Sequence, residues 1–104
     1  MLTQITARNF QASPALREYV DKRVSKLERF YDGIVHARVV MTKPSDETGT
    51  HEAEVTLEVF RQNLTATAQA ETHEQAVDEC VDRLRRQVLK YKERLRSTDK
   101  DVHR

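Results

Sequence analysis

The sequence predicts one α+β domain in the order β-α-β-β-β-α, with a four-stranded sheet and two helices packed on one of its faces. Two segments, near residues 14–31 and 72–96, repeat apolar residues at three- and four-residue steps, which is typical of helices with one buried stripe. Four other segments alternate apolar and polar residues, as strands with one buried face do. A chain of 104 residues is long enough to build one core.

The first helix is expected to begin at Ser13 and Pro14. Serine caps free backbone N–H groups, and proline at the first helical position loses no hydrogen bond. Asp32 and Gly33 are expected to close the helix, since glycine tolerates a positive φ. The predicted buried stripe consists of Leu16, Tyr19, Val20, Val24, Leu27, Phe30 and Tyr31.

Strands are expected near residues 2–9, 34–43, 52–59 and 64–70, with connections at 44–50 and 61–63. The last three are joined tightly and should form an antiparallel meander. The long helical connection suits a parallel crossover from the first strand to the second. The second strand is expected to bury Val35, Ala37, Val39 and Met41, and the third to turn Glu52, Glu54 and Glu58 toward solvent.

The last helix is expected to run from Thr72 to about Arg96, with Thr72 and Gln75 forming a capping box. Its apolar stripe includes Cys80, which is expected to be a small buried hydrophobe because no second cysteine exists to pair with it. Residues 97–104 lack periodicity and are expected to form a flexible tail. The full stripe is Val77, Cys80, Val81, Leu84, Val88, Tyr91 and Leu95.

Charge is segregated along this last helix. Residues 73–82 carry four acidic residues and no lysine or arginine, whereas residues 83–96 carry seven lysines and arginines and one glutamate. One or two cations would complement the helix dipole, but these cations extend over four turns. A polyanion-binding face is the interpretation we favour, against a merely solvated one. The row beside the apolar stripe is Arg83, Arg86, Lys90 and Arg94, and Arg85, Lys92 and Arg96 flank the stripe on its other side.

Other chemistry has little support in the sequence. The four histidines lie in different predicted elements without a paired spacing, and no phosphate-binding glycine loop or nucleophile motif is present. We therefore expect no metal, no cofactor, no catalytic residues and no small-molecule substrate. No run of apolar residues is long enough to span a membrane, so a cytoplasmic protein without membrane contact is expected.

Four strings, in the same order as in a known family, carry a resemblance over residues 2–94: Gln4–Asn9, Ser13–Val20, Lys26–Phe30 and Asp82–Val88. They resemble the ribosome hibernation promoting factor and ribosome-associated inhibitor family. The resemblance implies a single ribosome-binding domain over residues 1–96. It would bind the small ribosomal subunit and its rRNA over the channel for mRNA and for tRNA in the A and P sites, and inhibit translation in stationary phase or stress.

The resemblance also implies rRNA-binding residues and a subtype. The chain departs from the family pattern at Thr72–Ala76 and at Arg61–Asn63, and it looks like a short form. Some short forms promote ribosome pairing together with a ribosome modulation factor, and others oppose pairing through a longer tail; the tail here favours the first. The matching cations are Arg23, Lys26, Arg83, Arg86, Lys90 and Arg94.

Two other classes stay open from the sequence. A general double-stranded-RNA-binding module has a similar element order, but it places cations at the start of its last helix, where this chain has Glu71, Glu74, Asp78 and Glu79. A protein-interaction domain with solvated cations is the third class.

Overall fold

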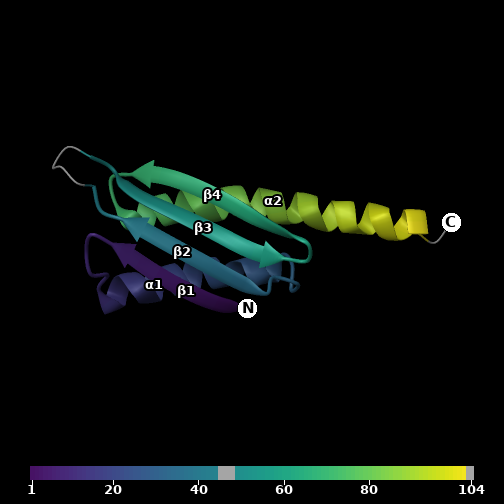
Figure 1. Ribbon diagram of the computed structural model, residues 1–104, viewed down its shortest axis with the longest axis horizontal. Coiled ribbons are helices and arrows are strands. Elements are labelled where there is room, and N and C mark those ends of the chain that lie inside the picture. Colours follow the sequence, from purple (N-terminus) through teal and green to yellow (C-terminus); the bar gives the residue numbers. More distant parts are fainter. Residues whose placement is uncertain (45–48, 103–104) are drawn as a thin grey trace.

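The computed structural model describes residues 1–44 and 49–102, with the side chains described up to residue 96. The chain forms a four-stranded sheet with two α-helices on one face (Figure 1), which confirms the predicted α+β class and element order. The elements are β1 (Leu2–Arg8), α1 (Pro14–Ser25), the 3-10 helix η1 (Lys26–Arg29), β2 (His36–Thr42), β3 (His51–Val59), β4 (Gln62–Ala70) and α2 (His73–Val102).

The strands lie in the order β1-β2-β3-β4, with β1 and β4 at the edges. β1 pairs in parallel with β2, and the other two pairings are antiparallel. This is the arrangement expected when a helix carries the chain from β1 to β2 and short turns join the rest. α2 packs on β3 and β4, and α1 packs on β1.

The core lies between the sheet and the two helices. The register places Val39 opposite Val55, and Val55 opposite Ala66, so that one row of small and branched side chains crosses three strands. Ala66 and Ala68 on β4 leave room for α2 to approach the sheet closely. Leu84 of α2 is fully buried, and burying a leucine contributes about 1.5–3 kcal/mol.

The opposite face of the sheet is open and polar, as the alternation on β3 predicts. Glu54 is exposed there, and Glu52 and Glu58 are half-buried. Glu58 forms an ion pair with Arg38, in which Arg38 Nη2 lies 2.8 Å from Glu58 Oε1. His36 Nδ1 lies 3.8 Å from Glu58 Oε2. Glu58 is therefore partly compensated by Arg38, and the face as a whole keeps its acidic character.

Both helix starts agree with the sequence. Ser13 Oγ accepts a hydrogen bond from Leu16 N with Pro14 in the first turn, and Thr72 Oγ1 accepts one from Gln75 N. The end of the first helix differs from the prediction. The α-helix α1 ends at Ser25, and the next residues form the 3-10 helix η1. A 3-10 helix repeats every three residues, so the tighter winding keeps Val24, Leu27 and Phe30 on the inner side.

Gly33 does not adopt the positive φ that was expected, since neither glycine of the chain is recorded with one. A Cβ at position 33 would overlap the outer end of the Tyr31 ring, so glycine lets this aromatic side chain lie close to the backbone in its present position. Among the described residues, the non-glycine residues with a positive φ are Asn9 (φ 68°) and Arg61 (φ 66°). Arg61 lies in the turn between β3 and β4.

Three further expectations were wrong in detail. Val35 precedes β2 and is 66% exposed instead of buried. Tyr19 is also exposed, because its hydroxyl reaches out to a carboxylate of α2. α2 continues past the predicted end at Arg96 to Val102, since nothing in Ser97–Val102 is a proline or glycine that would stop it.

Candidate nucleic-acid interface

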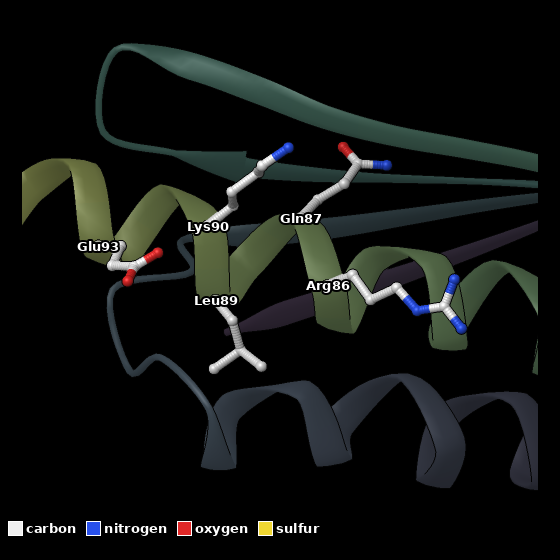
Figure 2. Close-up of a pocket in the computed structure, with 5 residues that line it drawn as sticks. All are labelled: Arg86, Gln87, Leu89, Lys90 and Glu93. Atoms are coloured by element: carbon white, nitrogen blue, oxygen red, sulfur yellow. The ribbon is translucent and has the colours of Figure 1, made fainter.

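The four cations predicted on the last helix lie together on one side of α2, and we call them the α2 row: Arg83, Arg86, Lys90 and Arg94. All four are exposed. Figure 2 shows Lys90 and Gln87 pointing toward the β3–β4 hairpin side, while Leu89 points toward α1. No carboxylate among the described residues forms an ion pair with Arg86 or Lys90. These two cations are therefore available to an external anion.

Arg83 differs from the rest of the row because it also serves the fold. Its Nη1 donates a hydrogen bond to the Thr67 carbonyl, and one turn later Gln87 Nε2 donates to the Thr65 carbonyl at 3.1 Å. Both carbonyls belong to the edge strand β4, where unpaired backbone groups invite pairing with another chain. Arg83 has five N–H donors, so one bond to the backbone leaves donors for a ligand.

Arg23, the first predicted residue on α1, joins the two helices. Its Nε lies 2.7 Å from Asp78 Oδ1, and the Tyr19 hydroxyl donates to the same carboxylate at 2.8 Å. The hydrogen bond to Asp78 is the main reason that the pKa of Tyr19 is raised above its usual value. The structure thus gives Arg23 a packing role, and its predicted contact with rRNA stays a prediction.

Lys26, the second predicted residue on the first helical segment, lines a groove between the two helices together with Arg23. We call this the interhelical groove; it has a volume of about 150 Å³ and a floor that includes Leu27 and Val81. Sequence reasoning missed two of its cations, Arg29 and Arg85. The full lining is Arg23, Lys26, Leu27, Arg29, Phe30, Val81, Asp82 and Arg85.

A signal for Arg85 was present in the sequence, because it heads the second set of cations beside the apolar stripe. Its guanidinium lies over the Phe30 ring, 5.7 Å from the centroid. The sequence pattern did not indicate that Arg29 faces this groove, because the prediction treated its segment as regular α-helix and it is a 3-10 helix. Lys92, from the same set as Arg85, donates to the Phe30 carbonyl at 3.3 Å and so helps to hold η1 against α2.

Two of the four histidines come together at the start of α2. His73 is buried, stacks on Phe10 with ring centroids 4.4 Å apart, and lies edge-on to His51 at 4.5 Å. Its Nε2 lies 3.2 Å from the Thr42 carbonyl, which can only accept, so Nε2 carries the hydrogen. Burial lowers the pKa of His73 below its ordinary value. Within residues 1–44 and 49–96, no three metal-ligating side chains come together.

Cys80 lies on the buried side of α2, as predicted, and is fully enclosed by the core. Its Sγ lies 3.4 Å from the carbonyl oxygens of Ala53 and Ala66. Burial raises the pKa of this thiol to about 11, so it is neutral at physiological pH. In the described part of the chain, no helix has both the length and the hydropathy to cross a bilayer.

The chain is similar to characterised proteins over nearly its whole length. The sequence model of the family described as Sigma 54 modulation protein / S30EA ribosomal protein matches residues 3–96. A ribosome hibernation promoting factor of Azotobacter vinelandii is 35% identical over 94 residues, which are 90% of this chain and 85% of that protein. The protein of the same name from Escherichia coli (strain K12) is 34% identical over 96 residues, covering 92% of this chain and 98% of that one.

A solved structure agrees with these matches. The N-terminal domain of Thermus thermophilus Protein Y superposes with a TM-score of 0.77 at 28% identity, covering 88% of this chain and 99% of that domain. The family match runs from residue 3 in β1 to residue 96 in α2 and includes every residue of the α2 row and of the interhelical groove. The chain therefore belongs to the Sigma 54 modulation protein / S30EA ribosomal protein family, as the resemblance predicted.

Proposed function

We propose that this protein is a ribosome hibernation factor that binds rRNA of the small ribosomal subunit through α2 and inhibits translation by occupying the path of mRNA and of tRNA in the A and P sites. The observation that carries the proposal is the α2 row, in which Arg86 and Lys90 are exposed and have no carboxylate partner in the described residues. The names of the similar proteins from Azotobacter vinelandii and Escherichia coli support the same role.

The spacing of the row suits an RNA backbone. Arg83 and Arg94 are eleven positions apart, which at 1.5 Å per residue is about 16 Å, enough to meet two or three phosphates of one strand. Phosphate contacts with lysine and arginine supply affinity, and they position a protein without reading sequence. The open face of the sheet carries Glu52, Glu54 and Glu58, which would repel phosphate, so the proposed contact is confined to the helical side.

Inhibition in this proposal depends on occupancy and not on cleavage. The α2 row offers cations that hold phosphate, and the proposal assigns no nucleophile or base that would cut it. We propose that the protein acts in this way in the cytoplasm during stationary phase or stress, with the small ribosomal subunit as its partner.

The first experiment is sedimentation of the purified protein with isolated small subunits and, separately, with plain duplex RNA. The proposal expects cosedimentation with the subunit and little with the duplex. Equal binding to both would favour the general double-stranded-RNA-binding module. Binding to neither would favour a protein-interaction domain.

The second experiment adds the protein to a cell-free translation reaction. Protein synthesis should fall while rRNA and mRNA stay intact on a denaturing gel. Specific cleavage by homogeneous protein would contradict the proposal. Gradient sedimentation of the treated ribosomes, with and without a ribosome modulation factor, then shows whether the protein promotes or opposes ribosome pairing.

A further inference from the structure

We infer that the tip of the β3–β4 hairpin is a stacking site for one unpaired nucleobase of RNA. The hairpin tip is the two-residue turn Phe60–Arg61, which joins the strands after the paired residues Val59 and Gln62. This inference rests on the proposed function and deepens it, because it adds a base-binding site at the end of the sheet to the cations of α2.

Phe60 is the most exposed aromatic side chain in the described part of the chain, at 62%. The next is Tyr19, at 37%, and its hydroxyl is already bound to Asp78. Phe60 does not belong to the hydrophobic core, so its ring contributes little to the fold. A single exposed apolar residue is common on protein surfaces, and the case for a site therefore depends on how this ring is held.

The backbone of the hairpin tip is anchored to α2. The Tyr91 hydroxyl donates a hydrogen bond to the Phe60 carbonyl at 2.5 Å. Tyr91 is itself buried and lies edge-on to Tyr31, with ring centroids 5.6 Å apart. The tip is thus fixed through its main chain while the Phe60 side chain stays in solvent. A binding group on an anchored backbone loses less conformational freedom when its ligand arrives.

Arg61 supplies the second part of the site. Its guanidinium lies over the Phe60 ring, 5.0 Å from the centroid, which is a cation–π contact that steadies the ring. The backbone of Arg61 has a φ of 66°, a conformation that glycine and asparagine adopt more readily than arginine. Strained residues of this kind are concentrated at functional sites. An arginine in this position therefore points to a use for its side chain.

The surroundings of the ring suit a nucleobase better than a protein. Apolar anchors of protein interfaces lie in well-packed surroundings that exclude water, whereas Phe60 is followed by Arg61, Gln62 and Asn63, which are all polar and exposed. Proteins bind single-stranded RNA with aromatic rings that stack on bases and with cations that hold the backbone. The side-chain amides of Gln62 and Asn63 can also donate to and accept from the edge of a base.

The α2 row leads to the hairpin tip. Tyr91, which holds the Phe60 carbonyl, directly follows Lys90 in the sequence and precedes Arg94 by three residues. In Figure 2, Lys90 points toward the side of α2 on which the hairpin lies. A strand whose phosphates lie on the end of the α2 row would therefore bring its bases to Phe60. The row and the tip would hold different parts of the same strand.

The first test uses the absence of tryptophan from the chain. Phe60→Trp keeps an aromatic ring and makes it the one tryptophan of the full-length protein. Its fluorescence is measured at low salt during titration with a single-stranded RNA oligonucleotide and, separately, with inorganic polyphosphate, which has phosphates but no bases. RNA should quench the fluorescence, and polyphosphate should not. The control is Val35→Trp, which places the tryptophan at another exposed position at the same end of the sheet and should not be quenched.

The second test measures binding of Phe60→Leu to small subunits at several salt concentrations. The affinity should fall by roughly 10-fold, because a stacked base is lost. The slope of log affinity against log salt should keep its wild-type value, because no charge is removed. Phe60→Trp and the control Val35→Ala should bind like the wild type, and circular dichroism establishes that each variant is folded.

The source of the base is identified with subunits alone and with subunits carrying mRNA. A loss of affinity for the bare subunit assigns the base to rRNA. A loss that requires the mRNA assigns the base to mRNA. Either result supports a base-stacking site at the hairpin tip.

The inference is overturned if single-stranded RNA does not quench Phe60→Trp, if polyphosphate quenches it equally, or if folded Phe60→Leu binds both kinds of subunit like the wild type. Reduced affinity without quenching by RNA would mean that a protein covers Phe60, and this also overturns the inference. These outcomes leave the proposed function intact. Failure of the proposed function is visible separately, because the wild-type protein would then not bind the small subunit at all.

Discussion

The two halves of α2 use their charged residues differently. In residues 73–82, two polar side chains hold other parts of the protein: Asp78 binds Arg23 and Tyr19, and His73 contacts the Thr42 carbonyl. In residues 83–96, Arg86 and Lys90 have no such contact among the described residues, and they point outward. One continuous helix thus fastens the fold along its length, through Asp78 in its first half and through Arg83 and Lys92 in its second. Its cations all lie in the second half. Substitutions in the two halves should therefore fail in different assays.

The largest expected effect is on binding, from Arg86→Glu with Lys90→Glu in the second half. Charge reversal adds repulsion to the lost attraction, so the affinity for the small subunit should fall by about 100-fold and the salt slope by about two units. Folding should survive, because both side chains are exposed. Sedimentation at several salt concentrations measures the first effect, and circular dichroism the second.

Glu54→Lys is the control for that variant, because Glu54 is exposed on the open face of the sheet. Glu58 is less suitable because it binds Arg38. Glu54→Lys should leave specific binding almost unchanged. A helix variant that is folded and still binds with wild-type affinity and salt slope would remove the α2 row from the interface.

Asp78→Ala should have the next largest effect, on stability. Arg23 and Tyr19 lose their shared acceptor, and hydrogen bonds to charged groups contribute more than neutral ones. Because the side chains of Arg23 and Asp78 are 33% and 38% exposed, the cost is discounted to about 1–2 kcal/mol of unfolding free energy. Chemical denaturation measures it.

Glu18→Ala is the matched control for Asp78→Ala. Glu18 pairs with Lys22 within α1, and both side chains are about 70% exposed (72% for Lys22 and 68% for Glu18), so its loss should hardly change stability. If Asp78→Ala kept wild-type stability but lost binding, the division between the two halves of α2 would be wrong.

Cys80→Ala should lower the free energy of unfolding by about 1 kcal/mol, the cost of a small cavity under α2. Binding to the small subunit should stay intact, because the thiol is buried and far from either cationic surface. A thiol whose pKa is about 11 should also react slowly with iodoacetamide at neutral pH in the folded protein, and rapidly after unfolding. Loss of binding without loss of stability would contradict a structural role.

The smallest expected effect is a pH dependence from His73. Its pKa in the folded protein lies below the ordinary value of 6.5, so protons bind the unfolded state more tightly. The stability that this group contributes is complete above pH 6.5, and it is lost as the pH falls through the lower, folded-state pKa. Denaturation curves of the wild type and of His73→Gln at several pH values between 5 and 8 should converge as the pH falls. Parallel curves would exclude His73 as the cause.

Periodicity in the sequence was sufficient to predict the fold, because each strand has one polar side and each helix one apolar stripe. It was not sufficient to predict the places where the backbone departs from a regular period. The stripe of the first helix continues to Tyr31 in the sequence, but the chain winds into η1 after Ser25 so that Leu27 stays buried. Gly33 lies against the outer end of the Tyr31 ring, a contact that the sequence pattern did not predict.

The two cationic surfaces also differ in whether the sequence pattern could predict them. The α2 row follows from helical spacing alone, since all its residues belong to one element. The interhelical groove combines Lys26 and Arg29 with Arg85, residues more than fifty positions apart in the chain, so it appears only when α1 and α2 are packed together. Likewise, sequence could select Arg23 as a cation but could not show that Asp78 already holds it.

The length of α2 has a consequence for hydrogen exchange. Its 30 residues span about 45 Å, and in Figure 1 its C-terminal turns extend past the end of the sheet. Tyr91 is the last buried residue of α2 in the described part, so amides before it should exchange only when the whole domain opens, whereas those beyond Leu95 depend on the helix alone. Slowed exchange in these last turns, upon addition of small subunits, would then show that the bound subunit reaches the part of α2 that follows the α2 row. Without subunits, the same amides test whether residues 97–104 are as flexible as the sequence predicts.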